Sequence, residues 1–294
     1  MKPARFQYLG PSTVEEAVTQ LAEHGDGARI LAGGQSLVPM MNLRLAKPAV
    51  LVDINRVTSL GAIRADASEL SLGATVRQGA ALRDAMVSRA APLVVHALRL
   101  VGHPQNRARG TVVGSLAHHD PAAELPAVAV ALGATITAVS VGGTRSIAAE
   151  EFFLEHYTTV LAPDEMATEV RFPVAGAGSG AAFEEICRRE GDFALVGVAA
   201  QLTIENGRVG DARIALAAVA RRPIRARRTE ATLRGQQISA DRVAEAARLT
   251  TEEEGVEPVS DIHASDRYRL EVLPVVAERA IIAAWTRASL ATAI

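Results

Sequence analysis

The sequence predicts an α+β protein made of three consecutive units. Helical and extended patterns are mixed along the chain, and a glycine-rich stretch at residues 175–180 is its clearest linker. Beyond this linker, the Asn206-Gly207 pair is a strong signal for a type I′ hairpin. We therefore expect two small α+β units at residues 1–55 and 56–175, and a C-terminal sheet-and-helix domain at residues 176–294.

The first unit is expected to contain one helix and two strands. Ser12 and Glu15 have the spacing of a capping box, and apolar residues recur at helical spacing after them. Residues 29–32 and 49–54 are short apolar runs typical of buried strands, and a Gly-Gly turn follows the first of them.

The second and third units are expected to combine hairpins with helices. We predict strands at residues 61–64, 70–74 and 134–139, helices at 76–89 and 92–100, and an irregular polar stretch at 102–110. In the third unit we predict paired strands at 195–204 and 209–219, and mostly helix from residue 227 onward.

The composition excludes several classes of protein. A formal net charge of -2 does not supply the cationic field that non-specific nucleic-acid binding needs. Cys187 is the only cysteine, which excludes an internal disulfide, a four-cysteine iron–sulfur cluster and a zinc ribbon. The start has no signal-peptide core, and the apolar runs are too short to span a bilayer. We expect a soluble cytoplasmic protein with no membrane span.

A first candidate binding loop consists of Ala32, Gly33, Gly34, Gln35 and Ser36. Glycine accepts a positive φ and lets a ligand approach the backbone. Consecutive backbone N–H groups in such a turn form a concave anion site, and the last two side chains add donors. The loop suits a diphosphate, although an ordinary Gly-Gly turn explains the local pattern at least as well.

A second candidate loop consists of Thr111, Val112, Val113, Gly114 and Ser115. A threonine and a serine bracket one glycine, which fits the same phosphate-binding logic more weakly. A strand with a glycine bulge is the alternative interpretation. Neither loop has the G-x-G-x-x-G spacing of a Rossmann fingerprint, and the chain has no Walker A lysine.

Other reactive residues lack the partners that their chemistry needs. His118 and His119 are adjacent, so on a strand they would point to opposite faces and would not bind one metal ion. No G-x-S-x-G elbow supports a serine triad. We expect Cys187 to be a half-buried residue of a strand and the arginine-rich run 221–228 to be a solvated or partner-facing surface. We predict no catalytic residue and no metal ligand.

Together, the two loops resemble those of the FAD-binding medium subunits of the molybdenum hydroxylases, the xanthine dehydrogenase and aerobic carbon monoxide dehydrogenase family. The similarity includes residues 6–13, 32–39, 50–54, 109–115, 117–126 and 189–194. The resemblance implies a two-part FAD-binding domain similar to that of vanillyl-alcohol oxidase, followed by a C-terminal domain built on a sheet with helices. FAD would lie between the first two units.

The resemblance also implies individual cofactor contacts. The second loop of the family is typically Thr-Ile-Gly-Gly-Ser or Thr-Ile-Gly-Gly-Asn, and Val113 replaces the first of those glycines. A β-branched residue resists a positive φ, so we expect the contacts to shift to its neighbours in the loop. Glu124 matches an acidic residue that bonds the ribose, Leu161 a backbone flavin contact, and Phe193 a position near the isoalloxazine. The expected cofactor-binding residues are Ala32, Gly33, Gly34, Gln35, Ser36, Leu37, Thr111, Val112, Gly114, Ser115, Asp120, Glu124, Leu161 and Phe193.

By resemblance, this chain would be the flavin end of an electron relay. Substrate would be oxidised at molybdopterin in a large partner subunit, and electrons would pass through two [2Fe–2S] clusters in a small subunit to FAD on this chain. The complex would be a dimer of heterotrimers. A stand-alone FAD oxidoreductase with its own substrate site, and a scaffold that has lost FAD, remain as alternatives.

Overall fold

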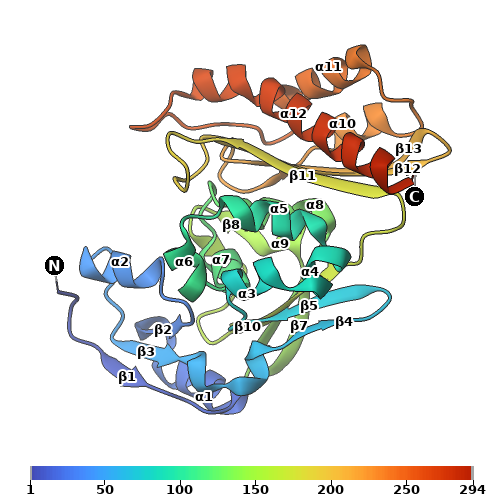
Figure 1. The fold of residues 1–294 in the computed structure, drawn as a ribbon. Coiled ribbons are helices and arrows are strands. Elements are labelled where there is room, and N and C mark those ends of the chain that lie inside the picture. Colours follow the sequence, from blue (N-terminus) through green and yellow to red (C-terminus); the bar gives the residue numbers. More distant parts are fainter. Residues whose placement is uncertain (1, 293–294) are drawn as a thin grey trace.

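The computed structural model describes residues 2–292, which form three main sheets with helices packed around them (Figure 1). In Figure 1 the chain runs from the first sheet at the lower left, through the middle unit, to the C-terminal sheet at the top. Helices and strands are mixed along the chain, so the predicted α+β class is confirmed. Within the described residues, no helix is both long enough and apolar enough to cross a bilayer.

The first sheet is parallel and has the order β1-β3-β2. Its elements are β1 (Gln7–Leu9), α1 (Val14–His24), η1 (Gly25–Gly27), β2 (Ala28–Leu31), α2 (Leu37–Asn42) and β3 (Val50–Asp53). The predicted capping pair of Ser12 with Glu15 is wrong by one residue. Thr13 Oγ1 accepts from the Glu16 N–H at 3.1 Å, and the Glu16 carboxylate accepts from the Ser12 N–H at 2.7 Å.

The middle sheet is five-stranded, in the order β4-β5-β10-β6-β7. Its strands are β4 (Ile63–Ala65), β5 (Glu69–Gly73), β6 (Thr135–Ser140), β7 (Gly143–Ala148) and β10 (Met166–Pro173). The helices are α3 (Gln78–Arg83), α4 (Ala85–Ala90), α5 (Pro92–Leu100), α6 (Pro104–Arg109), α7 (Val112–His118), α8 (Glu124–Leu132) and α9 (Ala149–Phe152). Two short 3-10 helices, η2 (Ile54–Arg56) and η3 (Thr58–Gly61), precede the sheet in the chain. A two-stranded ribbon of β8 (Phe153–Glu155) and β9 (Thr158–Thr159) lies between β7 and β10 in the sequence.

Two segments of the middle unit differ from the prediction. The helix expected at 76–89 is divided at Asp84, whose carboxylate accepts from the Met86 N–H (2.7 Å) and so begins α4. The stretch 102–110, expected to be irregular, contains α6. In both places a local cap or an N-terminal proline sets the helix boundary.

The C-terminal sheet is antiparallel, in the order β11-β12-β13-β14. Its elements are β11 (Ser179–Ile186), β12 (Val196–Glu205), β13 (Arg208–Ala217), β14 (Ile224–Arg225), α10 (Arg227–Leu233), α11 (Ala240–Leu249), η4 (Thr250–Glu252) and α12 (Asp266–Thr292). The predicted hairpin is confirmed: Asn206 and Gly207 have φ angles of 51° and 75°, as a type I′ turn requires. The long α12 packs across β11 and β12 (Figure 1).

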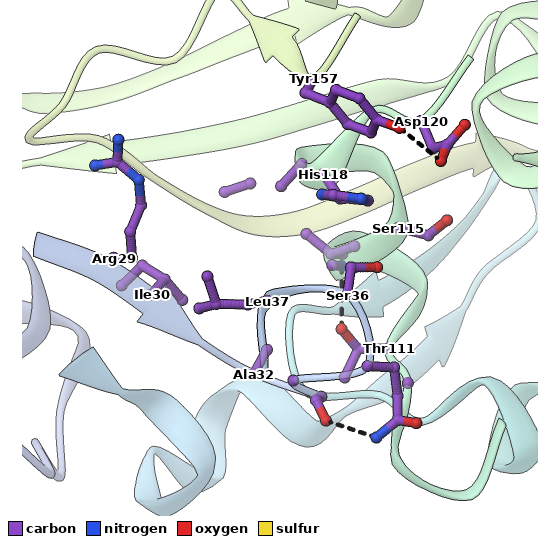
Figure 2. Close-up of a pocket in the computed structure, with 18 of the residues that line it drawn as sticks. Arg29, Ile30, Ala32, Ser36, Leu37, Thr111, Ser115, His118, Asp120 and Tyr157 are labelled. Atoms are coloured by element: carbon purple, nitrogen blue, oxygen red, sulfur yellow. Dashed lines mark hydrogen bonds between the residues drawn. The ribbon is translucent and has the colours of Figure 1, made fainter. Parts of the chain in front are cut away.

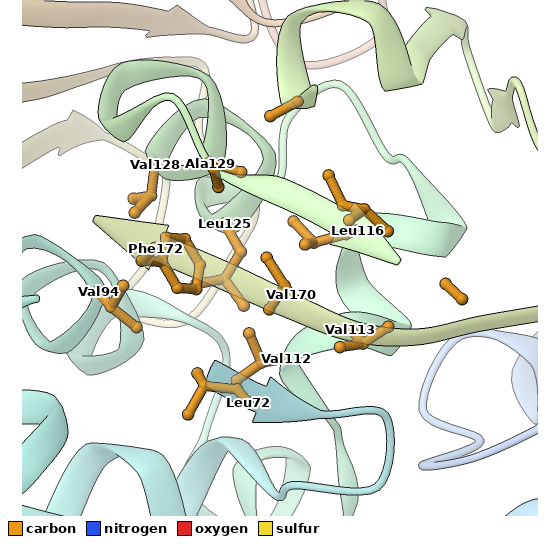
Figure 3. Close-up of a cluster of buried hydrophobic side chains, with 14 of the residues drawn as sticks. Leu72, Val94, Val112, Val113, Leu116, Leu125, Val128, Ala129, Val170 and Phe172 are labelled. Carbon is orange, nitrogen blue, oxygen red and sulfur yellow. The ribbon is translucent and has the colours of Figure 1, made fainter. Parts of the chain in front are cut away.

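Helices α5 and α8 pack against strands of the C-terminal sheet and so join it to the middle unit. All nine residues of α8 are buried. Val112, Val113 and Leu116 of α7 enter the same core, beside Leu125 and Val170 (Figure 3). The core therefore fixes the direction of α7 and the start of α8, which are the two helices that lead into the site.

The arginine-rich run 221–228 is only in part the solvated or partner-facing surface that was predicted. Arg225 is largely buried and pairs with the buried carboxylate of Glu230. Arg227 pairs with Glu150 of the middle unit at 2.6 Å. A buried carboxylate requires a partner, so burial of Glu230 explains why this part of the run is turned inward.

Candidate functional site

A cavity of about 940 Å³ brings together the two loops predicted from the sequence (Figure 2). It is lined by residues of the first sheet, the middle unit and the segment 191–193 that follows β11. Its size lies within the range of small-molecule and cofactor sites. Thirteen of the predicted residues line it: Ala32, Gly33, Gly34, Gln35, Ser36, Leu37, Thr111, Gly114, Ser115, Asp120, Glu124, Leu161 and Phe193.

Val112 is the predicted site residue that does not line the cavity. Its side chain is fully buried in the core beside Leu72 and Val170 (Figure 3). The residue therefore anchors α7 in the core.

The first loop connects β2 to α2 and depends on two glycines for different reasons. Gly34 has a φ of 72°, a conformation that side-chain-bearing residues rarely adopt. At Gly33, an added Cβ would lie 2.5 Å from the Arg109 carbonyl oxygen and 2.8 Å from Gly110 Cα. The absence of a side chain at Gly33 therefore allows the backbones of the two loops to touch.

Polar side chains beneath the cavity hold the two loops together. Asn55 Nδ2 donates to the Ala32 carbonyl oxygen at 2.9 Å, and Asn55 Oδ1 accepts from the Arg77 guanidinium. Arg77 also donates to the Arg109 carbonyl oxygen at 2.5 Å. These bonds connect the end of β2 to the segment that enters the second loop, so the spacing of the loops is fixed by the fold before any ligand binds.

The second loop is a helix start, and the alternative of a bulged strand is wrong. Thr111 is the N-cap of α7, and its Oγ1 accepts from the Gly114 N–H at 3.0 Å. Val113 lies in the helix with its side chain buried in the core, so it needs no positive φ. The replacement of a glycine by Val113 is therefore compatible with the fold of this loop.

One of the residues that line the cavity carries a buried carboxyl group. Glu124 begins α8 and is 4% exposed. Burial, together with the nearby carboxylate of Glu185, raises the pKa of Glu124 to about 8. Burial also raises the pKa of Glu185 to about 7. Near pH 7 Glu124 is therefore mostly protonated and presents both a donor and an acceptor to a sugar hydroxyl.

An ion pair supports the segment that carries Leu161. Arg145 donates two hydrogen bonds of 2.7 Å to the carboxylate of Glu165 and a third, of 2.9 Å, to the Val160 carbonyl oxygen. Glu165 in turn accepts from the Ala162 N–H at 2.8 Å. Leu161 is thus flanked on both sides by backbone groups fixed to one bidentate pair.

Several cavity residues were not predicted as site residues. His118 lies one helical turn after Ser115, and recognising α7 as a helix would have placed both on one face. Tyr157 comes from the connection between β8 and β9, and no local pattern marks it. Cys187 is half-buried as predicted, but it lies directly after β11 and not in a strand. Burial raises the pKa of its thiol, which keeps it protonated and unreactive.

The chemistry of the lining fits an elongated, phosphate-containing cofactor such as FAD. The backbones of the two loops touch at the cavity wall, and the hydroxyl-bearing Ser36, Thr111 and Ser115 also line the cavity. The protonated Glu124 suits a sugar, while Leu37 and Leu161 supply apolar surface for a ring system. These features together match a dinucleotide better than an isolated phosphate.

Comparison with known proteins gives the same assignment over nearly the whole chain. Residues 4–175 match the FAD binding domain in molybdopterin dehydrogenase, and residues 181–284 match the CO dehydrogenase flavoprotein C-terminal domain. The 6-hydroxypseudooxynicotine dehydrogenase complex subunit alpha of Paenarthrobacter nicotinovorans is 40% identical, with 98% of this chain and 97% of that protein covered.

Solved structures show the same fold. A chain of carbon monoxide dehydrogenase from Hydrogenophaga pseudoflava superimposes with a TM-score of 0.94 at 38% identity, covering 98% of this chain and 99% of that one. A chain of quinoline 2-oxidoreductase from Pseudomonas putida 86 superimposes with a TM-score of 0.92 at 40% identity, covering 99% of each chain. The chain therefore belongs to the FAD-binding subunits of the molybdenum hydroxylases, a family of oxidoreductases.

Proposed function

We propose that this chain carries the FAD of a molybdenum-containing hydroxylase or dehydrogenase and passes electrons from the [2Fe–2S] clusters of a partner subunit to an external acceptor. The observation that carries the proposal is the meeting of the two loops, through Gly33 and Gly110, at the wall of one cavity. When bound there, FAD would supply the ability to accept electrons singly and release them as a pair.

We assign the residues of the cavity to parts of the cofactor. The N–H groups of the first loop, with the hydroxyls of Thr111 and Ser115, would hold the diphosphate. Glu124 would bond a ribose hydroxyl, with Asp120 beside it. Leu161 and Phe193 would contact the isoalloxazine ring. Phe193 is 58% exposed, so its side chain is free to make such a contact. The three units, ending near residues 55 and 175, would hold the cofactor between the first two.

Partner subunits are also part of the proposal. A large molybdopterin subunit and a small iron–sulfur subunit would complete a dimer of heterotrimers in the cytoplasm. The support is that similar proteins are named as medium chains or subunits of dehydrogenase complexes. Cys187 is the only cysteine of this chain, so the chain cannot supply the cysteine ligands of an iron–sulfur cluster by itself.

Release of cofactor from purified protein tests the proposal. The chain is expressed alone and with candidate partner subunits, purified, and denatured, and the supernatant is examined for FAD by absorbance and fluorescence. We expect FAD at close to one per chain. A folded chain that takes up no FAD, even after incubation with it, would contradict the proposal. Reduction of bound flavin by a small substrate without partner subunits would instead favour a stand-alone oxidoreductase.

A further inference from the structure

Two side chains on one wall of the cavity, those of His118 and Tyr157, have no role in the assignment above, and they lie beside Asp120. His118 ends α7, and its ring lies against that of Tyr157 with centroids 5.1 Å apart. Tyr157 Oη donates to Asp120 Oδ2 at 3.3 Å (Figure 2). All three residues line the cavity.

The backbone that presents this group is strained at two places. His119 and Tyr157 have φ angles of 47° and 56°, which residues with side chains rarely adopt. The Tyr157 N–H donates to the His119 carbonyl oxygen at 2.9 Å, and His119 Nδ1 is 3.0 Å from the Thr158 carbonyl oxygen. Strain of this kind persists only where surrounding contacts maintain it, and it is concentrated at functional sites.

The positive φ of His119 sets the direction of the chain after α7. A left-handed residue at 119 ends α7 directly after His118 and directs Asp120 toward the cavity. Asp120 is then fixed, because its Oδ1 accepts from the Ala122 N–H at 2.9 Å while Oδ2 accepts from Tyr157. Tyr157 is 55% exposed, so the strain is not needed to bury its ring in the core.

The ring nitrogens of His118 are available to a ligand. Among residues 2–292, neither nitrogen makes a hydrogen bond, although the side chain is half-buried. Burial lowers the pKa of His118, so the ring is neutral near pH 7 and offers one donor and one acceptor. Ser115, one turn earlier on α7, lines the same cavity as the histidine.

We propose that His118 forms a hydrogen bond to an oxygen of the bound dinucleotide and that Tyr157, held by Asp120, positions the imidazole ring. This inference rests on the proposed function, since it assigns a further contact in the FAD cavity. It predicts that His118 contributes to affinity through its ring nitrogens, whereas Tyr157 contributes only through His118.

Equilibrium binding of FAD to the full chain tests the proposal. Apo-protein is titrated with FAD, and the change in flavin fluorescence gives Kd for wild type, His118→Ala, His118→Gln and Tyr157→Phe. We expect His118→Ala to weaken binding about five- to tenfold, His118→Gln to recover most of the loss, and Tyr157→Phe to weaken binding about two- to threefold. In the His118→Ala background, Tyr157→Phe should have no further effect.

Two matched variants control for unspecific effects. Tyr268 of α12 and the half-buried His96 of α5 do not line the cavity. Tyr268→Phe and His96→Ala should leave Kd for FAD unchanged. Thermal unfolding of every apo-variant reports whether the fold is intact.

The outcomes separate this inference from the proposed function. Titration with ADP and with riboflavin 5′-phosphate shows which half of the dinucleotide His118 contacts, and a loss with either probe supports the inference. If wild type binds FAD and a folded His118→Ala variant binds FAD, ADP and riboflavin 5′-phosphate equally well, the inference is wrong and the proposed function stands. A folded wild type that binds no FAD overturns both.

Discussion

Two walls of the cavity are held in shape by different means. The wall from the first sheet is a short, largely half-buried loop whose form depends on backbone conformation, with Gly34 at positive φ and Gly33 against another backbone. The adjoining wall consists of helix ends fixed by a cap and by buried side chains, such as those of Thr111 and Val113. The comparison teaches that a glycine in a binding loop is required only where packing or φ demands it.

The largest effect should come from the wall that depends on backbone. In Gly33→Val, the new side chain would meet the carbonyl of Arg109 and Cα of Gly110, neither of which can rotate away. We expect a loss of about 3 kcal/mol in unfolding free energy, since backbone has to move, and no FAD retained after gel filtration. Gly27→Val is the control, because its nearest neighbour, Ala49 Cβ, is 3.8 Å away. A Gly33→Val protein with full flavin occupancy would show that the loops do not need to touch.

On the wall formed by α7, a change from valine to glycine should lower stability, whereas at Gly33 the change from glycine to valine does so. Val113→Gly restores the residue that is typical of the family, but it removes a fully packed side chain and places glycine in a helix. We expect a loss of about 2 kcal/mol, measured by urea unfolding, and no gain in FAD affinity. Tighter FAD binding by this variant would mean that the valine obstructs the cofactor.

The pH dependence of stability should reveal the buried carboxyl group of Glu124 on the helical wall. Glu124 has a pKa of about 8 in the folded chain, above the value of 4.5 expected when it is exposed, so the folded state holds a proton that the unfolded state has lost. The unfolding free energy of the apo-protein should therefore fall as pH rises from about 5 to 8, by at most about 1.4 kcal/mol per pH unit from this residue. Glu185 should add to the fall up to about pH 7.

Comparison of Glu124→Gln with wild type isolates this contribution. The amide does not titrate, so the stability of the variant relative to wild type should increase with pH and level off above about pH 8. Chemical unfolding at a series of pH values measures the difference. Glu23→Gln, at an exposed position of α1, is the control for the chemical change from glutamate to glutamine. Parallel curves for Glu124→Gln would contradict the assignment of a protonated carboxyl group.

The smallest effect should come from the helix cap. Thr111→Ala removes the acceptor of the Gly114 N–H at the start of α7. We expect a loss of about 1 kcal/mol in unfolding free energy, and a modest loss of FAD affinity because the variant lacks the hydroxyl proposed to hold the diphosphate. Thr111→Ser keeps the oxygen and should restore stability, as differential scanning fluorimetry can show. No change in Thr111→Ala would mean that the cap has no energetic role.

Features encoded by adjacent residues were predictable from the sequence. The Asn206-Gly207 turn needs only its own two residues to fix its type, and the structure has the expected positive φ at both. The two glycine loops were recognised in the same way, and the structure brings them to one cavity. The capping box of α1 was misplaced because Ser12 and Thr13 are both followed, three residues later, by glutamate.

Features that depend on distant residues were not predictable. Val112 and Val113 favour a strand locally, but the apolar core around Leu72 and Val170 accommodates them on a helix. Tyr157 reaches the cavity only because its backbone pairs with His119, 38 positions earlier in the numbering. The contact between Gly33 and Gly110 likewise has no signal in either segment alone.

The order in which the cavity walls occur along the chain has a consequence for biosynthesis. The lining begins near Leu21, continues through Ser115 and Leu161, and is completed only by Phe193, about two thirds of the way through the 294 residues. A ribosome therefore has to release all of these segments before they can surround a ligand. FAD would therefore bind late in folding, and it would hold together segments that are synthesised at different times.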